Sequence, residues 1–182
     1  YEQALLGDKL RFRLGKLDLT GGFECRGCPV AFDGSAYAND ETSQFLNGAL
    51  VNNPTIPFPE NGLGIAAYLQ PLKWWYVAAG VADAQADARE TGFNTAFHGR
   101  SDFFSIFETG VVPRLPSRKG PLPGAYRIGL WYDPQPKDRF DGRGVKRDDA
   151  GFYLSFDQMV LKENADEEDG QGLGLFTRYG LA

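Results

Sequence analysis

A strict alternation of apolar and polar side chains, sustained over strand-length segments, most constrains the fold of this chain. It is clearest in residues 125–133, where one row of alternate positions holds Tyr126, Ile128, Leu130 and Tyr132. Because successive side chains of a β-strand point to opposite faces, this segment is predicted to be a strand with one apolar and one polar face. Aromatic residues at both ends of the apolar row, with aliphatic ones between, are typical of a strand that crosses both interfaces of a membrane.

The same alternation predicts seven strands. They cover residues 9–18, 63–70, 74–82, 103–114, 125–133, 151–161 and 172–181. Most are longer than the roughly five to six residues of an ordinary strand. They suit a tilted transmembrane strand of about 9 to 11 residues. Two short helices are also predicted, at residues 42–50 and 84–89. We therefore expect an all-β protein.

Composition narrows the function classes. The 182 residues include 23 glycines and 11 prolines, and 14% are aromatic, which favours strands and turns over helices. A net charge of −5 argues against a nucleic-acid partner, because such proteins carry a basic face. The longest run without charged or strongly polar side chains, residues 74–82, is too short for a transmembrane helix, which needs about 20 residues.

The connections between the predicted strands broadly alternate in length. The long ones are residues 19–62, 83–102 and 134–150, and the short ones are residues 71–73, 115–124 and 162–171. An antiparallel meander places these two groups at opposite rims, as in outer-membrane barrels with short periplasmic turns and longer extracellular loops. Bacterial barrels have an even number of strands, from about eight upward. Residues 1–182 are therefore predicted to form part of a single, larger transmembrane β-barrel domain.

The polar rows of these strands supply the candidate site. Carboxylates and guanidinium groups exchange hydrogen bonds with hydroxyl groups, and aromatic rings offer apolar faces, so such a wall suits a small hydrophilic solute. The predicted pore-lining residues are Arg11, Arg13, Lys16, Asp18, Tyr68, Tyr76, Glu108, Arg127, Trp131, Tyr153, Asp157 and Arg178. Their excess of cations predicts a pore that admits anions at least as readily as cations. For each residue alone, an internal salt-bridge ladder that stiffens the wall is the alternative.

The sequence predicts neither a metal nor another cofactor. Cys25 and Cys28 form a lone Cys-Arg-Gly-Cys, and the sole histidine, His98, lies far away in the sequence. A four-ligand zinc site needs more ligands nearby, so a local disulfide or two idle thiols are favoured. Residues 138–149 are rich in aspartate and arginine but lack the spacing of a calcium loop, which indicates a solvated loop.

Two other function classes fit parts of the pattern. Glu108 and Asp157 have the residue type of a glycosidase pair, but no motif supports that chemistry and arginines are abundant beside them. We therefore predict that the protein is not an enzyme. A secreted carbohydrate-binding β-sandwich also alternates apolar and polar residues, and it remains the alternative function.

Six stretches of the chain resemble the carbohydrate-selective porin family known as OprB. They are residues 12–18, then 45–47 followed by Pro57 and 62–64, then 75–81, 123–132, 151–153 ahead of 157–158, and 171–180. Their order and spacing extend over nearly the whole sequence. The resemblance implies an outer-membrane barrel of about sixteen strands, of which this chain is an internal segment.

The resemblance also implies a function and a location. The protein would lie in the bacterial outer membrane, in contact with its lipid and lipopolysaccharide, and would pass sugars or other small hydrophilic solutes by facilitated diffusion. Residues 19–62 would fold inward and narrow the pore. Association into a homo-oligomer is left open.

Overall fold

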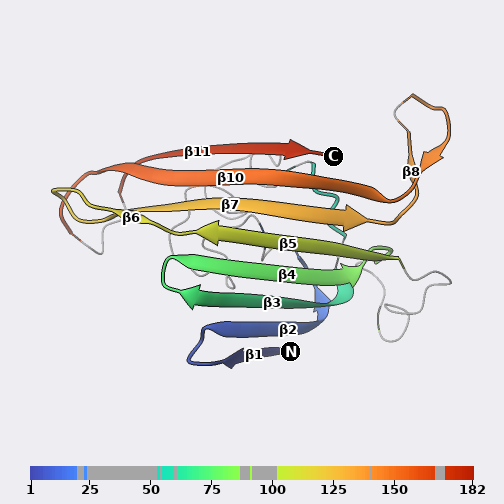
Figure 1. The fold of residues 1–182 in the computed structure, drawn as a ribbon, viewed down its shortest axis with the longest axis horizontal. Helices are drawn as coiled ribbons and strands as arrows, with labels where there is room; N and C mark the ends of the chain where they lie inside the picture. The colour runs from blue at the N-terminus through green and yellow to red at the C-terminus, as the bar shows by residue number, and fades with distance from the viewer. Residues whose placement is uncertain are drawn as a thin grey trace.

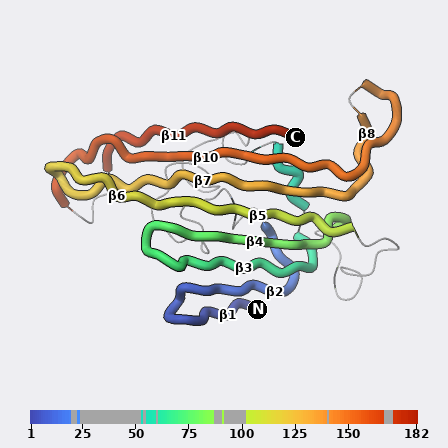
Figure 2. The backbone as a smooth tube through the Cα atoms, in the orientation of Figure 1, coloured from blue at the N-terminus to red at the C-terminus, as the bar shows by residue number. Residues whose placement is uncertain are grey.

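The computed structural model describes residues 1–19, 23, 53, 55–59, 61–86, 91, 102–139, 141–166 and 171–182. In these ranges the chain forms one large open antiparallel sheet and one small separate sheet (Figures 1 and 2). No helix in the described ranges is long and apolar enough to cross a membrane.

The large sheet is a meander, because its main strands lie side by side in sequence order. These strands are β1 (Glu2–Leu5), β2 (Leu10–Leu17), β3 (Gly62–Leu72), β4 (Trp75–Asp83), β5 (Phe103–Val111), β7 (Leu122–Asp133), β10 (Asp149–Lys162) and β11 (Gly172–Leu181). Strand β6 (Arg114–Leu115) pairs with β7 beside this path, while β8 (Lys137–Asp138) and β9 (Val145–Lys146) form the small sheet. The predicted all-β fold and its seven strands are confirmed, with ends shifted by a few residues.

Two predictions about secondary structure need correction. The N-terminal strand β1 was not predicted, since its four residues show no clear alternation; it pairs with β2, and Glu2 contacts Arg13 at 3.4 Å. Residues 84 and 85 form a turn and residue 86 is irregular where a helix was predicted, and Asp83 Oδ1 accepts a hydrogen bond from the Gln85 backbone N–H at 2.9 Å. The rest of that predicted helix, and the one at residues 42–50, lie outside the described residues.

The two rims are those expected from the connection lengths. At one rim, at the left of Figure 1, the Val112 N–H donates to Trp74 O at 2.8 Å, and Lys119 Nζ donates to Glu163 O at 2.7 Å. These bonds join the short connections to one another. At the opposite rim the Ala84 N–H donates to Asp102 O at 2.9 Å, and Gln135 Nε2 donates to Ala84 O. We refer to the two ends as the short-turn rim and the long-loop rim.

The outward face of the sheet is apolar in the predicted phase. Tyr126, Ile128, Leu130 and Tyr132 are 38 to 55% exposed, whereas Arg127 and Trp131 are buried on the opposite face. The pairing register continues this exterior across the whole sheet. One transverse row of outward residues consists of Phe12, Ala67, Ala79, Phe107, Leu130, Phe152 and Leu181. An exposed apolar face of this extent marks a surface that contacts lipid or another protein.

Gln158 interrupts this apolar exterior, and the structure shows how it is accommodated. The β10–β11 register shifts between Met159 and Leu161. Gln158 Nε2 donates to the carbonyl oxygens of Leu122 and Pro123, each at 3.2 Å, while its Oε1 accepts from the Tyr126 hydroxyl at 3.0 Å. The buried amide is therefore satisfied at the short-turn rim, beside the tyrosine that begins the outward row of β7.

The buried core lies on the inward face of the sheet. Leu19, Phe23 and Ile56 are each at most 5% exposed and pack against side chains of the wall. The Phe23 ring centroid lies 5.8 Å from that of Tyr68. Gly80 allows this approach, because a Cβ there would lie only 3.0 Å from the Phe23 ring. The described parts of residues 19–62 thus lie against the inner wall, as the resemblance implied.

Candidate functional site

The predicted wall residues come together through the pairing register, which sets most of them in three neighbouring rows across the inner face. The row nearest the long-loop rim holds Arg13 and Trp131. The middle row holds Arg11, Tyr68, Glu108 and Tyr153, and the third row holds Tyr76, Arg127 and Arg178. Asp157 follows one step closer to the short-turn rim, opposite Ala125.

Glu108 is the centre of a buried hydrogen-bonded cluster. The Tyr76 hydroxyl of β4 donates to Glu108 Oε1 at 2.7 Å, and the Tyr153 hydroxyl of β10 donates to Oε2 at 2.6 Å. Each carboxylate oxygen therefore accepts a short hydrogen bond from a different strand. Hydrogen bonds to an ionised acceptor are stronger than neutral ones, so the cluster fixes the carboxylate against the wall.

Two glycines make room for these tyrosine rings. Gly129 lies between Tyr153 and Glu108 in the register, and a Cβ on it would lie 2.0 Å from the Tyr153 ring. Gly110 lies opposite Tyr76, and a Cβ there would lie 2.8 Å from that ring. The bare backbone of β7 thus lets Tyr153 lie across it and reach Glu108 on β5.

Arg127 and Asp157 form a buried ion pair next to this cluster. Arg127 Nη2 lies 3.6 Å from Asp157 Oδ2, and the two side chains are only 2% and 1% exposed. The desolvation cost of burying such a pair can cancel its attraction, whereas removing one partner is strongly destabilising. The pair therefore fixes how β7 and β10 fit together more than it adds net stability.

Burial divides the predicted site residues into two groups. Tyr68, Tyr76, Glu108, Arg127, Trp131, Tyr153 and Asp157 are buried, whereas Arg11, Arg13 and Arg178 keep part of their surface exposed on the same inner face. Close packing of the first group favours the stiffening ladder as its role. Among the partly exposed arginines, Arg13 keeps 30% of its side chain exposed, whereas the Nε and Nη1 atoms of Arg178 are buried.

Lys16 and Asp18 do not join the inner face. Lys16 pairs with Leu63 and, like Leu14, occupies an outward position of β2. Asp18 is exposed between the buried Leu17 and Leu19. Both charges are predicted from the sequence to line the pore, but strand parity turns Lys16 outward and Asp18 lies beyond the end of β2.

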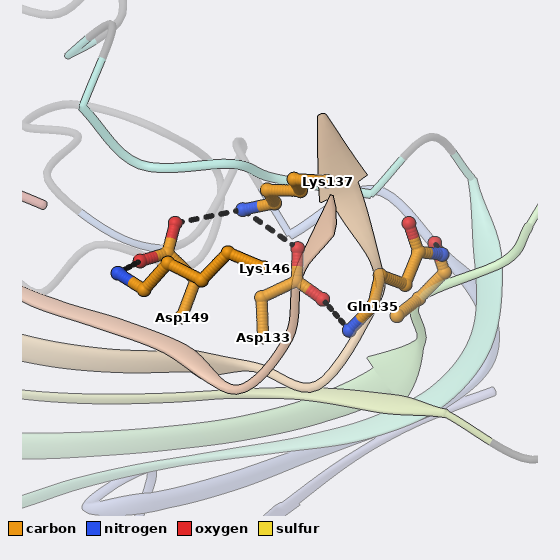
Figure 3. A network of polar contacts seen from close by, with 6 residues as sticks. Asp133, Gln135, Lys137, Lys146 and Asp149 are labelled. Carbon is orange, nitrogen blue, oxygen red and sulfur yellow. Dashed lines mark hydrogen bonds and ion pairs between the residues drawn. The ribbon is translucent and has the colours of Figure 1, made fainter. Parts of the chain in front are cut away.

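Sequence reasoning missed a polar network at the long-loop rim. Lys137 Nζ lies 3.1 Å from Asp133 Oδ2 and 3.2 Å from Asp149 Oδ2, and Lys146 Nζ lies 3.2 Å from Asp149 Oδ1 (Figure 3). The Gln135 backbone N–H donates to Asp133 Oδ1 at 3.0 Å. The ends of β7 and β10 are thereby tied to the β8–β9 hairpin.

A pocket of about 730 Å³ opens beside this network. Its lining comes from the inward segment, from the end of β7, from the β8–β9 hairpin and from the first residue of β10. The lining residues are Thr55, Pro57, Trp131, Lys137, Asp138, Arg139, Asp141, Lys146, Asp149 and Ala182. The sequence predicts a solvated loop for this stretch, but the structure shows a hairpin. Gly142 and Gly144 have positive φ in its turn, and two glycines so close together are the sequence signal that could have indicated it.

Asp149 lies at the rim, outside the belt of exposed apolar side chains. Partial burial alone would raise the pKa of its carboxyl, but the hydrogen bonds from Lys146 and Lys137 outweigh that effect and lower the pKa below its usual value of 3.8. Asp149 is therefore ionised at neutral pH.

The described residues contain no group of three or more His, Cys, Asp or Glu side chains placed to hold a metal ion. Cys25, Cys28 and His98 lie outside the described residues. Asp133 at the end of β7 and Asp149 at the start of β10 are instead paired with Lys137.

Comparison with known proteins agrees with this architecture. Among curated protein sequences, none matches the chain. One solved structure that is similar to it is the high-pH structure of OprB from Pseudomonas putida, with a TM-score of 0.64 and 19% sequence identity. The match covers 99% of this chain and 43% of that porin. At this identity the likeness shows the fold, and the chain spans less than half the length of the solved barrel.

A sequence model of the carbohydrate-selective porin family OprB matches residues 1–182, which is the whole chain. The six stretches noted in the sequence, the meander with its apolar exterior and the likeness to the solved porin all agree with this match. The chain belongs to the carbohydrate-selective porin family OprB.

Proposed function

We propose that this chain forms part of a single outer-membrane barrel domain that passes small hydrophilic solutes, sugars among them, by facilitated diffusion. The observation that carries the proposal is the division between the two faces of one sheet. The outward face is apolar from β2 to β11, and the inward face carries arginines, carboxylates and tyrosines. Such a sheet lowers the barrier to a polar solute, because its charged row faces a path away from hydrocarbon.

The outward face would lie against outer-membrane lipid. Tyr126 and Tyr132, at the two ends of the exposed row of β7, suit the two interfaces of the bilayer. Contact with lipopolysaccharide, and association of several barrels, belong to the same proposal and depend on parts of the protein beyond these strands.

The inner arginines give the path its electrical character. Of the predicted wall residues that lie on the inward face, Arg11, Arg13, Arg127 and Arg178 are cationic, and only Glu108 and Asp157 are anionic. A narrow wet path with this excess would admit anions at least as readily as cations. An enzyme is not proposed, because Glu108 is held by two tyrosines and Asp157 lies against Arg127.

The test uses the complete porin that contains this segment, reconstituted in planar bilayers. We expect ion conductance, a reversal potential in a KCl gradient that shows no cation preference, and a fall in conductance when glucose is added. Arg11→Gln should shift selectivity toward cations, and Arg118→Gln, an exposed change at the short-turn rim, should not. Conductance with strong cation selectivity and no sugar effect would reduce the proposal to a general porin. A freely soluble protein without conductance would favour the secreted sugar-binding sandwich.

A further inference from the structure

We infer that the pocket at the long-loop rim binds an uncharged polyhydroxy solute, and that a solute reaches this pocket before it reaches the inner wall. The inference rests on the proposed function and goes beyond it by assigning a site and a charge preference to the mouth of the path. Its residues were not among those that the sequence argument selected, apart from Trp131.

The first argument is the charge balance of the lining. Three cations, Lys137, Arg139 and Lys146, face three anions, Asp138, Asp141 and Asp149. A lining without net charge attracts neither ion over the other, in contrast to the arginine-rich wall further in. A pocket of about 730 Å³ also lies within the roughly 300 to 1,000 Å³ that small-molecule sites occupy.

The second argument is hydrogen-bonding capacity. Lys137 and Lys146 are held by carboxylates at 3.1 to 3.2 Å, so their positions are set before a solute arrives. An ammonium group has three donors and a carboxylate about four acceptor positions, which leaves capacity on both after these contacts. Neighbouring donors and acceptors of this kind match the paired hydroxyl groups of a polyol.

The third argument is Trp131. Its side chain lines the pocket and is buried, and no group among the described residues accepts a hydrogen bond from its indole N–H. A buried donor without an acceptor is costly, and a solute hydroxyl in the pocket would supply one. Lys137 Nζ lies over the Trp131 ring, 5.5 Å from its centroid, and both side chains line the pocket.

The position of the pocket determines which residues a solute meets first. Trp131 and Arg127 lie on the same face of β7, four residues apart, which corresponds to about 13 Å along a strand. Thr55 and Pro57 of the inward segment complete the lining. A solute that arrives from the long-loop rim would therefore meet the balanced pocket first and the arginine rows next.

The experiment measures glucose block of the complete porin in planar bilayers, with glucose added to one side at a time. We expect block at lower concentration from the side of the long-loop rim. Trp131→Phe keeps the ring but removes the N–H, and it should weaken glucose block by about two- to tenfold. Trp74→Phe, at the exposed short-turn rim, is the matched control and should leave the block unchanged.

A second pair of variants changes the charge balance of the lining at two members of the rim network. Lys137→Gln lies on the hairpin and should also weaken glucose block. Asp149→Asn gives the lining a net positive charge and should raise the apparent affinity for gluconate relative to glucose. If Trp131→Phe and Lys137→Gln block like wild type, the inference is overturned while the porin proposal stands. A wild-type channel that conducts ions but that glucose does not block at all would overturn the inference and reduce the proposed function to that of a general porin.

Discussion

The outward and inward faces of the sheet are built from alternate residues of the same strands, yet they follow different rules. On the outward face the central side chains of β7, Ile128 and Leu130, are apolar and exposed to their surroundings. On the inward face Glu108, Tyr76 and Tyr153 come from three strands and form one cluster. Substitutions outside should therefore act through the solvent that the side chain meets, and substitutions inside through the partners that they leave behind.

The largest effect is expected where an inward charge loses its partner. Asp157→Asn removes the carboxylate that faces Arg127 at 3.6 Å in a fully buried position. Leaving one charge of a buried pair should lower the free energy of unfolding by about 3 to 5 kcal/mol. Urea unfolding of the complete porin in lipid vesicles, followed by tryptophan fluorescence, measures the change. Asp138→Asn in the exposed hairpin is the control. Equal stability for both variants would show that the inward charges do not depend on their partners.

On the outward face the largest single effect should come from a charge placed in the apolar row. Leu130 is 55% exposed near the middle of the row on β7. Leu130→Arg should cost about 2 to 4 kcal/mol if the side chain meets hydrocarbon at the bilayer midplane. The same unfolding measurement applies. A cost within about 0.5 kcal/mol, as for an ordinary surface change, would mean that the face meets water and would favour the sandwich.

A smaller loss should follow from one methyl group on the inward face. Gly129→Ala places a Cβ where the Tyr153 ring lies, at 2.0 Å, so the ring must shift away from Glu108. Overpacking of this kind typically costs about 1 to 3 kcal/mol. Tyr153→Phe removes only the hydroxyl, and comparing the two variants separates the steric effect from the lost hydrogen bond. Unchanged stability in Gly129→Ala would show that the ring has another place to lie.

These differences between the two faces explain which parts of the structure the sequence predicts. The phase of each strand follows from period-two alternation, so the exposed row of β7 and the burial of Arg127 were predictable from residues 125–133 alone. Long-range pairing has no such local signal. Nothing in the sequence near Glu108 shows that Tyr76 and Tyr153 reach it, because the contact depends on the register of β4, β5, β7 and β10.

The two errors have different origins, one in strand parity and one in long-range pairing. Lys16 was counted as an inner residue because it is charged and near a strand end, although its even position in β2 turns it outward beside Leu14. The rim pocket was missed because its charges come from the hairpin and from the ends of β7 and β10. Asp133 and Asp149 are sixteen residues apart in sequence, and Lys137 joins them only when the hairpin folds back.

The smallest effect is expected at the long-loop rim, where the paired side chains are half-exposed and not buried as on the inward face. Because the folded-state pKa of Asp149 lies below its usual value of 3.8, the ion pairs with Lys137 and Lys146 stabilise the hairpin fully above that value. That stabilisation is lost as the pH falls through the lowered folded-state pKa. Backbone-amide exchange of the hairpin, corrected for the intrinsic rate, should therefore be constant from about pH 8 to 5 and faster below about pH 4.

Asp149→Asn should show the faster exchange already at neutral pH. Asp148→Asn is the matched control, since Asp148 accepts from the Tyr132 hydroxyl at 2.6 Å instead. Exchange that accelerates between pH 6 and 5, or that Asp149→Asn leaves unchanged, would show that the lysine contacts do not hold the hairpin to the rim.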